Sequence, residues 1–130
     1  MTASEKNKKI RDTIISSFHR VHNKLGYGFL EEVYEKALLI ELEKACLSCI
    51  NHTPVKVYYD HRKIGDFYAD IIVGEDVIIK IISAEEIKPS DEKELLNTMK
   101  ATGVSTGMVL NFGMQAHHVI CEMKKEMEKV

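Results

Sequence analysis

The segment from Gly65 to Ser83 constrains the fold more than any other part of the sequence. It reads GDFYADIIVGEDVIIKIIS, two apolar runs separated by Gly74-Glu75, a pattern that predicts two antiparallel β-strands joined by a tight turn. Asp70 interrupts the first apolar run, and Lys80 is the one charge in the second. Burying a charge is costly unless the charge is paired, hydrogen-bonded or bound to a metal. The segment therefore predicts either a structural ion pair between Asp70 and Lys80 or an altered metal site.

The composition indicates one soluble domain spanning residues 1–130. Of the 130 residues, 45% are hydrophobic and 29% are charged, which is ordinary for a globular protein. Because no apolar run approaches the roughly 20 residues that span a bilayer and no signal-like segment opens the chain, we expect a cytoplasmic protein without a membrane partner. The net charge of −2 and the pI of about 6.3 exclude a global basic field, so any nucleic-acid binding must be local.

Three cysteines, at positions 46, 49 and 121, are too few for a disulfide framework and agree with a reducing compartment. Cys46 and Cys49, followed by His52, have the spacing of zinc ligands. A structural zinc site needs four ligands, however, and no second such pair is present. Buried or half-buried thiols are the simpler interpretation, and a small zinc-binding protein is the third functional alternative.

Apolar residues at helical spacing predict two helices before the first strand. Residues 7 to 25 carry one apolar stripe that ends before Gly26, and residues 28 to 46 carry a second. His22 lies beside the first stripe, as expected for a histidine packed at the edge of a helix. The residues expected to face inward are Ile10, Ile14, Phe18, Val21 and Leu25 in the first helix, and Leu30, Val33, Ala37, Leu38, Leu42 and Ala45 in the second.

The start of the second helix carries a further candidate site. Gly28, Glu31 and Tyr34 follow each other at steps of three, so they share one helix face. Beside a glycine, the Glu31 carboxylate has room for a metal, a water molecule or a cation from another element. A solvated acid in the first helical turn is the alternative interpretation.

The remaining pattern completes an α+β order. Strands are predicted at 54–60, 65–73, 77–82 and 106–112, a helix from 89 to about 102, and a C-terminal helix from 115 to 130. A helix that crosses between the third and fourth strands predicts that these strands are either parallel or separated by one position. We therefore expect a mixed sheet flanked by helices.

Several of these stretches together resemble the GxxExxY family, a branch of the PD-(D/E)XK nuclease superfamily. They are LGYGFLEEVYEKALLIEL, GDFYADIIV and VLNFG, and the resemblance covers about residues 10 to 115. The signature is intact as Gly28, Glu31 and Tyr34, preceded by a run that includes His22. The resemblance implies an αβββαβ restriction-endonuclease-like core, the same order as the pattern predicts.

The resemblance also implies a metal site that this chain has altered. Active members hold Mg²⁺ with acids on the second and third core strands and use a lysine two residues beyond the second acid. Asp70 matches the first acid and Glu31 a helical glutamate, so these two residues are the metal ligands if the site still binds one. Lys80 replaces the second acid, and Ile82 replaces the lysine. A glutamine and a tyrosine of the family correspond to Glu94 and Thr98.

Two functions follow as expectations. The first is a nuclease fold with a degraded catalytic motif, acting without a cofactor as a nucleic-acid-binding, protein-binding or regulatory module, with a homodimer among its expected associations. The second is a metal-dependent nuclease in which Asp70, Glu31 and Glu94 hold Mg²⁺ or Mn²⁺ and Lys80 is a migrated catalytic lysine. In the first case we expect Lys80 to pair with Asp70 or Glu31, and Glu31 to be held by Tyr34 or a backbone donor rather than by solvent.

Overall fold

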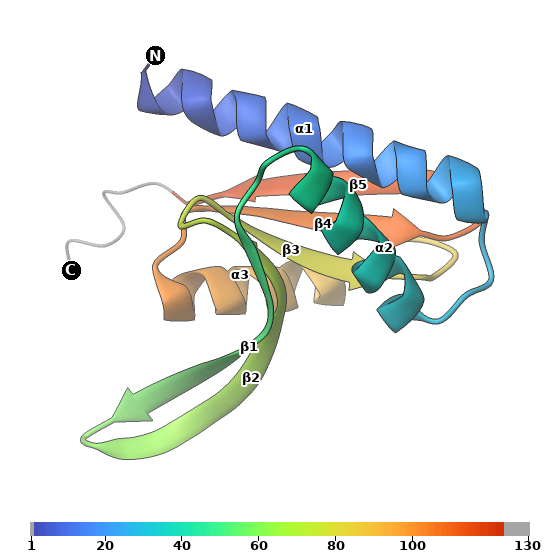
Figure 1. Ribbon diagram of the computed structural model, residues 1–130. Helices are drawn as coiled ribbons and strands as arrows, with labels where there is room; N and C mark the ends of the chain where they lie inside the picture. Colours follow the sequence, from blue (N-terminus) through green and yellow to red (C-terminus); the bar gives the residue numbers. More distant parts are fainter. Residues whose placement is uncertain (1, 124–130) are drawn as a thin grey trace.

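A five-stranded mixed sheet forms the centre of the molecule, with two helices on one face and one on the other (Figure 1). The computed structural model describes residues 2–123. None of the helices in this part of the chain is both long and apolar enough to cross a membrane. The elements in chain order are α1 (Ala3–Leu25), α2 (Glu31–Lys44), β1 (Cys49–Tyr59), β2 (Arg62–Val73), β3 (Val77–Ile82), α3 (Pro89–Thr102), β4 (Thr106–Phe112) and β5 (Ala116–Glu122).

The first helix forms as its apolar spacing predicts. Thr2 caps the start of α1 by accepting a hydrogen bond from the Glu5 amide, and Gly26 ends it with φ of 69°. Four of the five stripe residues are buried, and Leu25 packs against the same core. This stripe covers the sheet face formed by alternate residues of β3 and β4.

The second helix begins three residues later than expected, at Glu31. Gly28 has φ of 112° and belongs to the preceding loop. The prediction that Leu30 and Ala45 face the core is therefore wrong. Leu30 is 73% exposed in the loop, and Ala45 is exposed beyond the helix end. The buried face instead includes the polar side chains of Tyr34, Glu35 and Glu41, which a pattern of apolar residues cannot reveal.

The strands pair in the order β1-β2-β3-β4-β5. β3 and β4 are adjacent and parallel across the α3 crossover, which confirms the mixed sheet. β1 and β2 turn at Asp60-His61, where φ is 48° and 64°, so β2 begins at Arg62 rather than at the expected residue 65. β2 pairs with β3 only from Ile71 to Val73. The remaining β1–β2 ribbon, residues 54–68, projects from the body, and we call it the arm (Figure 1).

The predicted C-terminal helix is not found at residues 116–122, which form strand β5; residues 124–130 lie outside the described part of the chain. β5 pairs antiparallel with β4 at the edge of the sheet. Alternate β5 residues pack on opposite faces: Ile120 contacts the core beneath α1, whereas Val119 and Cys121 contact the core beneath α3. Burial on both faces therefore overrides the helical spacing of the tail.

Candidate functional site

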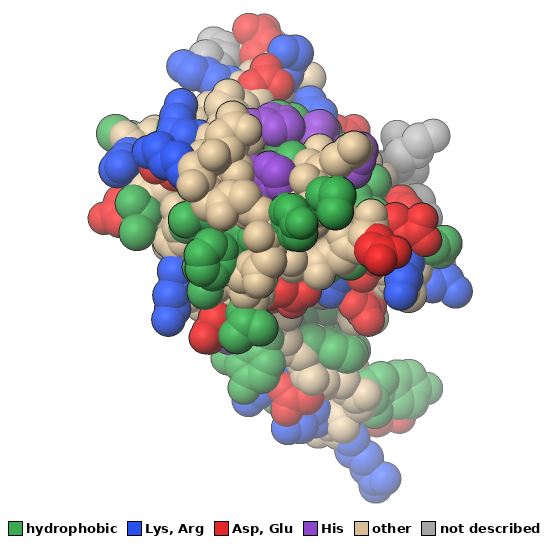
Figure 2. Space-filling view, turned by 90° about the vertical axis from the view of Figure 1, so that its right-hand side faces the viewer, with side chains coloured by type: hydrophobic (Ala, Val, Ile, Leu, Met, Phe, Trp, Pro, Cys, Tyr) green, Lys and Arg blue, Asp and Glu red, His purple; other side chains and the backbone are tan. Residues whose placement is uncertain are grey.

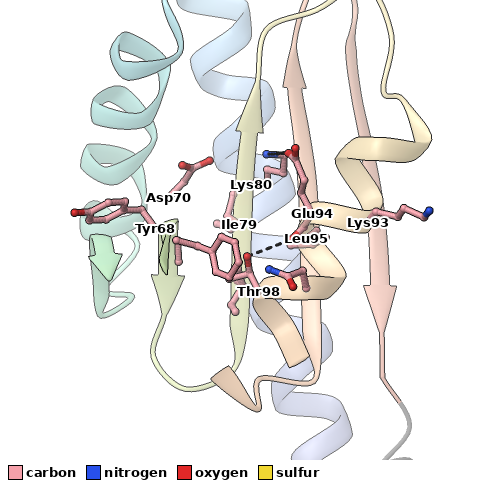
Figure 3. A pocket seen from close by; sticks show the side chains of 12 residues that line it. Tyr68, Asp70, Ile79, Lys80, Lys93, Glu94, Leu95 and Thr98 are labelled. Atoms are coloured by element: carbon pink, nitrogen blue, oxygen red, sulfur yellow. Dashed lines mark hydrogen bonds and ion pairs between the residues drawn. The ribbon is translucent and has the colours of Figure 1, made fainter. Parts of the chain in front are cut away.

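A cleft opens where β2 separates from β3 and α3 packs beside them (Figure 3). Its volume is about 510 Å³, within the range of small-ligand pockets. Side chains from β2, β3 and α3 line it, and three of the predicted site residues are among them: Asp70, Lys80 and Glu94. In Figure 3, Tyr68 and Lys93 project outward from opposite sides of the cleft.

Asp70 bridges β2 and β3 just beyond the end of their ladder. The strand ladder ends at Ile71–Ile79, so the amide of Ile81 has no backbone partner on β2. The Asp70 Oδ2 atom accepts a hydrogen bond from this amide at 2.8 Å. Since Ile81 is only 3% exposed, its N–H would otherwise be buried without a partner. One oxygen of the candidate metal ligand thus already has a structural hydrogen bond.

Lys80 pairs with Glu94 and not, as expected, with Asp70 or Glu31. Its Nζ lies 2.7 Å from Glu94 Oε2, and the two side chains meet across the cleft (Figure 3). The Lys80 side chain is 24% exposed and the Glu94 side chain 64%. The expectation was wrong because Lys80 shares the α3-facing side of β3 with Ile78 and Ile82, so the nearest acid comes from that helix.

Ile82, which the resemblance matches to the family lysine, is an ordinary core residue. It is 6% exposed and packs in the same cluster as Ile78 and Leu95. The two side chains thus lie in different surroundings. Lys80 carries a charge in the cleft, whereas Ile82 adds apolar surface to the core beneath α3.

Glu31 is exposed, which contradicts the expectation that it is shielded from solvent. Its Oε2 atom does accept a backbone hydrogen bond, from the Ser83 amide at 3.3 Å. Tyr34 is fully buried and makes its hydrogen bonds to other residues. The Tyr34 hydroxyl donates to the Gly26 carbonyl at 2.6 Å and accepts from the Phe29 amide at 3.3 Å.

The other motif residues hold loops at the same end of the sheet. Tyr34 fixes the loop that contains Gly28, whose positive φ suits a residue without a side chain. His22 donates from Nε2 to the Gly113 carbonyl at 2.7 Å, so it ties α1 to the β4–β5 turn. Glycine is required at 113, because an added Cβ would overlap the Ala84 carbonyl oxygen. These motif residues therefore shape the loops around the ends of β3 and β4.

Sequence reasoning missed Glu35, a carboxylate one turn beyond Glu31. It is 6% exposed, and burial raises its pKa above the usual range. Its Oε2 accepts a hydrogen bond from the Asn51 side-chain nitrogen Nδ2 at 3.4 Å and lies 3.3 Å from His52 Nε2. The negative charge of Asp70 also raises the Glu35 pKa, so the two carboxylates share one region. The sequence could have identified Glu35, because residues four apart lie on the same helix face and Glu31 was already a candidate.

The donor set does not fit a divalent metal. Mg²⁺ needs several oxygen ligands around one point, but Asp70 and Glu31 each direct an oxygen at a different backbone amide, those of Ile81 and Ser83. Lys80 adds a positive charge to the same cleft as Asp70. Within residues 2–123, no group of three or more His, Cys, Asp or Glu side chains could hold a metal ion, so the zinc spacing at Cys46 does not produce a site there either.

Comparisons with known proteins agree with this architecture. The family model of the PD-(D/E)XK nuclease superfamily matches residues 8–125. A crystal structure of an alkaline exonuclease from Laribacter hongkongensis is similar, with a TM-score of 0.55 and 14% identity. The similarity covers 75% of this chain and 58% of the exonuclease, so this chain spans little more than half of that protein. No curated protein sequence matches significantly. At this identity, the structural likeness shows the fold alone.

Proposed function

The chain belongs to the PD-(D/E)XK nuclease superfamily, and we propose that it binds nucleic acid beside the cleft without cutting it. The observation that carries this proposal is the ion pair between Lys80 and Glu94 at 2.7 Å. The resemblance to the family assigns Lys80 to the second acid position, so an ammonium group replaces a carboxylate there. A cation a few ångströms from a metal position repels the metal by several kcal/mol at protein-like dielectric.

Charges and aromatic rings along the cleft favour nucleic acid as the partner. A second groove, of about 340 Å³, shares Asn97 with the cleft and runs between the arm and α3. Lys56 and Lys100 line it together with Tyr58. Neither lysine belongs to an ion pair of the described structure, so both are available for phosphate groups.

Aromatic side chains add surfaces on which bases can stack. Tyr58 is 59% exposed and Tyr68 is 65% exposed. Stacking on aromatic rings combined with lysine contacts is the usual way to bind nucleic acid without reading its sequence. This local basic and aromatic track agrees with a chain whose net charge is slightly negative.

The binding test uses fluorescence anisotropy of labelled single- and double-stranded oligonucleotides in EDTA. We expect binding that weakens as the salt concentration rises. For Lys56→Glu and Lys100→Glu, the logarithm of the binding constant should fall less steeply with the logarithm of the salt concentration, because phosphate contacts are lost. Lys9→Glu, an equal charge change at an exposed position of α1, serves as the control. Equal affinities for the parent and all three variants would refute the proposed track.

The cleavage test uses the same oligonucleotides with Mn²⁺. The parent should be inactive. The triple variant Lys80→Glu, Ile82→Lys and Glu94→Gln should gain cleavage that Asp70→Ala abolishes, because it restores the second acid and the lysine and removes the acid that would repel the new carboxylate. Circular dichroism must show that this variant folds, since Ile82 lies in the core. A parent that already cuts, and loses activity with Lys80→Met, would establish the migrated-lysine nuclease instead.

A further inference from the structure

An apolar groove lies at the end of the molecule away from the arm, where the α1–α2 loop meets the ends of β3 and β4. We call it the end groove; its volume is about 490 Å³. It has four large, exposed apolar side chains in or beside it: Tyr27, Phe29, Leu30 and Met114, which are 60%, 48%, 73% and 68% exposed. Figure 2 shows this face, with hydrophobic side chains gathered near its centre.

The charges of the end groove are acidic. Glu85 lines it, and Glu31 reaches it through the hydrogen bond to Ser83, another lining residue. Glu32 and Glu86 follow directly in the sequence and are exposed. None of its eight lining residues is a lysine or an arginine. The groove therefore suits a partner that combines apolar side chains with positive charge.

The tip of the arm has this complementary chemistry. Tyr59 and Ile64 are 68% and 66% exposed. Arg62 lies between them and is exposed. Lys63 is paired with Asp66 at 2.9 Å, whereas no ion pair within residues 2–123 includes Arg62. The tip thus presents apolar surface and the cation Arg62, beside one exposed acid, Asp60, in the turn itself.

We propose that the arm tip of one chain docks in the end groove of a second copy of the same chain. The tip and the groove lie at opposite ends of the molecule, so a chain cannot fill its own groove (Figure 1). If two copies exchange arms around a two-fold axis, each contributes one tip and one groove. Two such contacts bury twice the area of a single contact, which brings a small interface closer to the size of a stable dimer.

The charge pattern provides a specific test by sedimentation velocity over a range of concentrations. The parent should self-associate. Arg62→Glu and Glu85→Lys should each weaken association by about tenfold or more, because each turns two attractive contacts per dimer into repulsive ones. An equimolar mixture of the two variants should associate like the parent, since each tip then meets a groove of opposite charge.

Matched controls carry the same charge changes elsewhere on the surface. Lys9→Glu on α1 and Glu43→Lys on α2 are exposed positions outside both surfaces, and they should associate like the parent. Restored association in the mixture also demonstrates that both variants fold. A monomeric parent, single variants that associate normally, or a mixture that stays dissociated would each overturn the proposal.

The outcome is independent of the proposed nucleic-acid track. Glu85→Lys should leave oligonucleotide affinity unchanged, because the end groove is distant from Lys56 and Lys100. A monomeric parent whose oligonucleotide binding is weakened by Arg62→Glu would assign the arm tip to nucleic acid. A monomeric parent that binds a basic, apolar peptide in the end groove would assign that groove to a different protein. Either result rejects self-association.

Discussion

Asp70→Ala should lower the free energy of unfolding by about 2 kcal/mol, because the alanine leaves the buried Ile81 amide without a partner. Leaving a buried donor unsatisfied costs about 1–3 kcal/mol, more when the lost acceptor is charged. Loss of the Asp70 charge near Glu35 relieves some repulsion and offsets part of this cost. For a chain of this length, the change corresponds to a melting temperature lower by roughly 6–8 °C.

Lys80→Met provides the matched comparison in the same cleft. Its partner Glu94 is 64% exposed and regains water when the pair is lost, and exposed ion pairs contribute only about 0–1 kcal/mol. The methionine retains much of the apolar stem of the lysine. We therefore expect a change in stability within about 1 kcal/mol, far less than for a fully buried pair.

The assay is thermal unfolding followed by circular dichroism, at neutral pH and in EDTA, for the parent and three variants. Asp70→Asn should lie between the parent and Asp70→Ala, because an amide oxygen can still accept the Ile81 hydrogen bond without the charge. An Asp70→Ala variant that melts like the parent, or a Lys80→Met variant that loses more stability than Asp70→Ala, would refute this reading of the cleft.

Three further predictions concern groups outside the cleft. Burial raises the pKa of Glu35, so the parent loses stability relative to Glu35→Gln as pH rises through that pKa; urea unfolding from pH 4 to 7 measures the difference, and a constant difference would contradict it. Exposed Cys46 should react first with an alkylating reagent, and Cys46→Ser should remove the fast phase, because burial raises the pKa of Cys49; mass spectrometry of timed samples gives the order. Gly113→Ala should destabilise the fold by more than 2 kcal/mol, since its Cβ would overlap the Ala84 carbonyl oxygen; an unchanged melting temperature would exclude that close contact.

The sequence by itself determined the elements whose residues repeat with a simple period. The apolar stripe of α1 and the short apolar runs of β3 and β4 follow the helical and strand periods, and the structure buries them accordingly. The parallel pairing of β3 and β4 is one of the two arrangements that the α3 crossover predicted. Asp70 was identifiable as a constrained residue because an acid among apolar residues needs a partner.

Only the tertiary structure decided which partners those charges have. Lys80 meets Glu94 because α3 folds back over the same face of β3, fourteen residues later in the chain. Asp70 binds the Ile81 amide because β2 pairs with β3 over only three residues, from Ile71 to Val73. β5 forms where a helix was predicted because the edge of β4 offers hydrogen bonds and burial on both faces. Periodicity reports which side of an element is buried, whereas pairing depends on contacts between distant segments, and these exist only once the chain has folded.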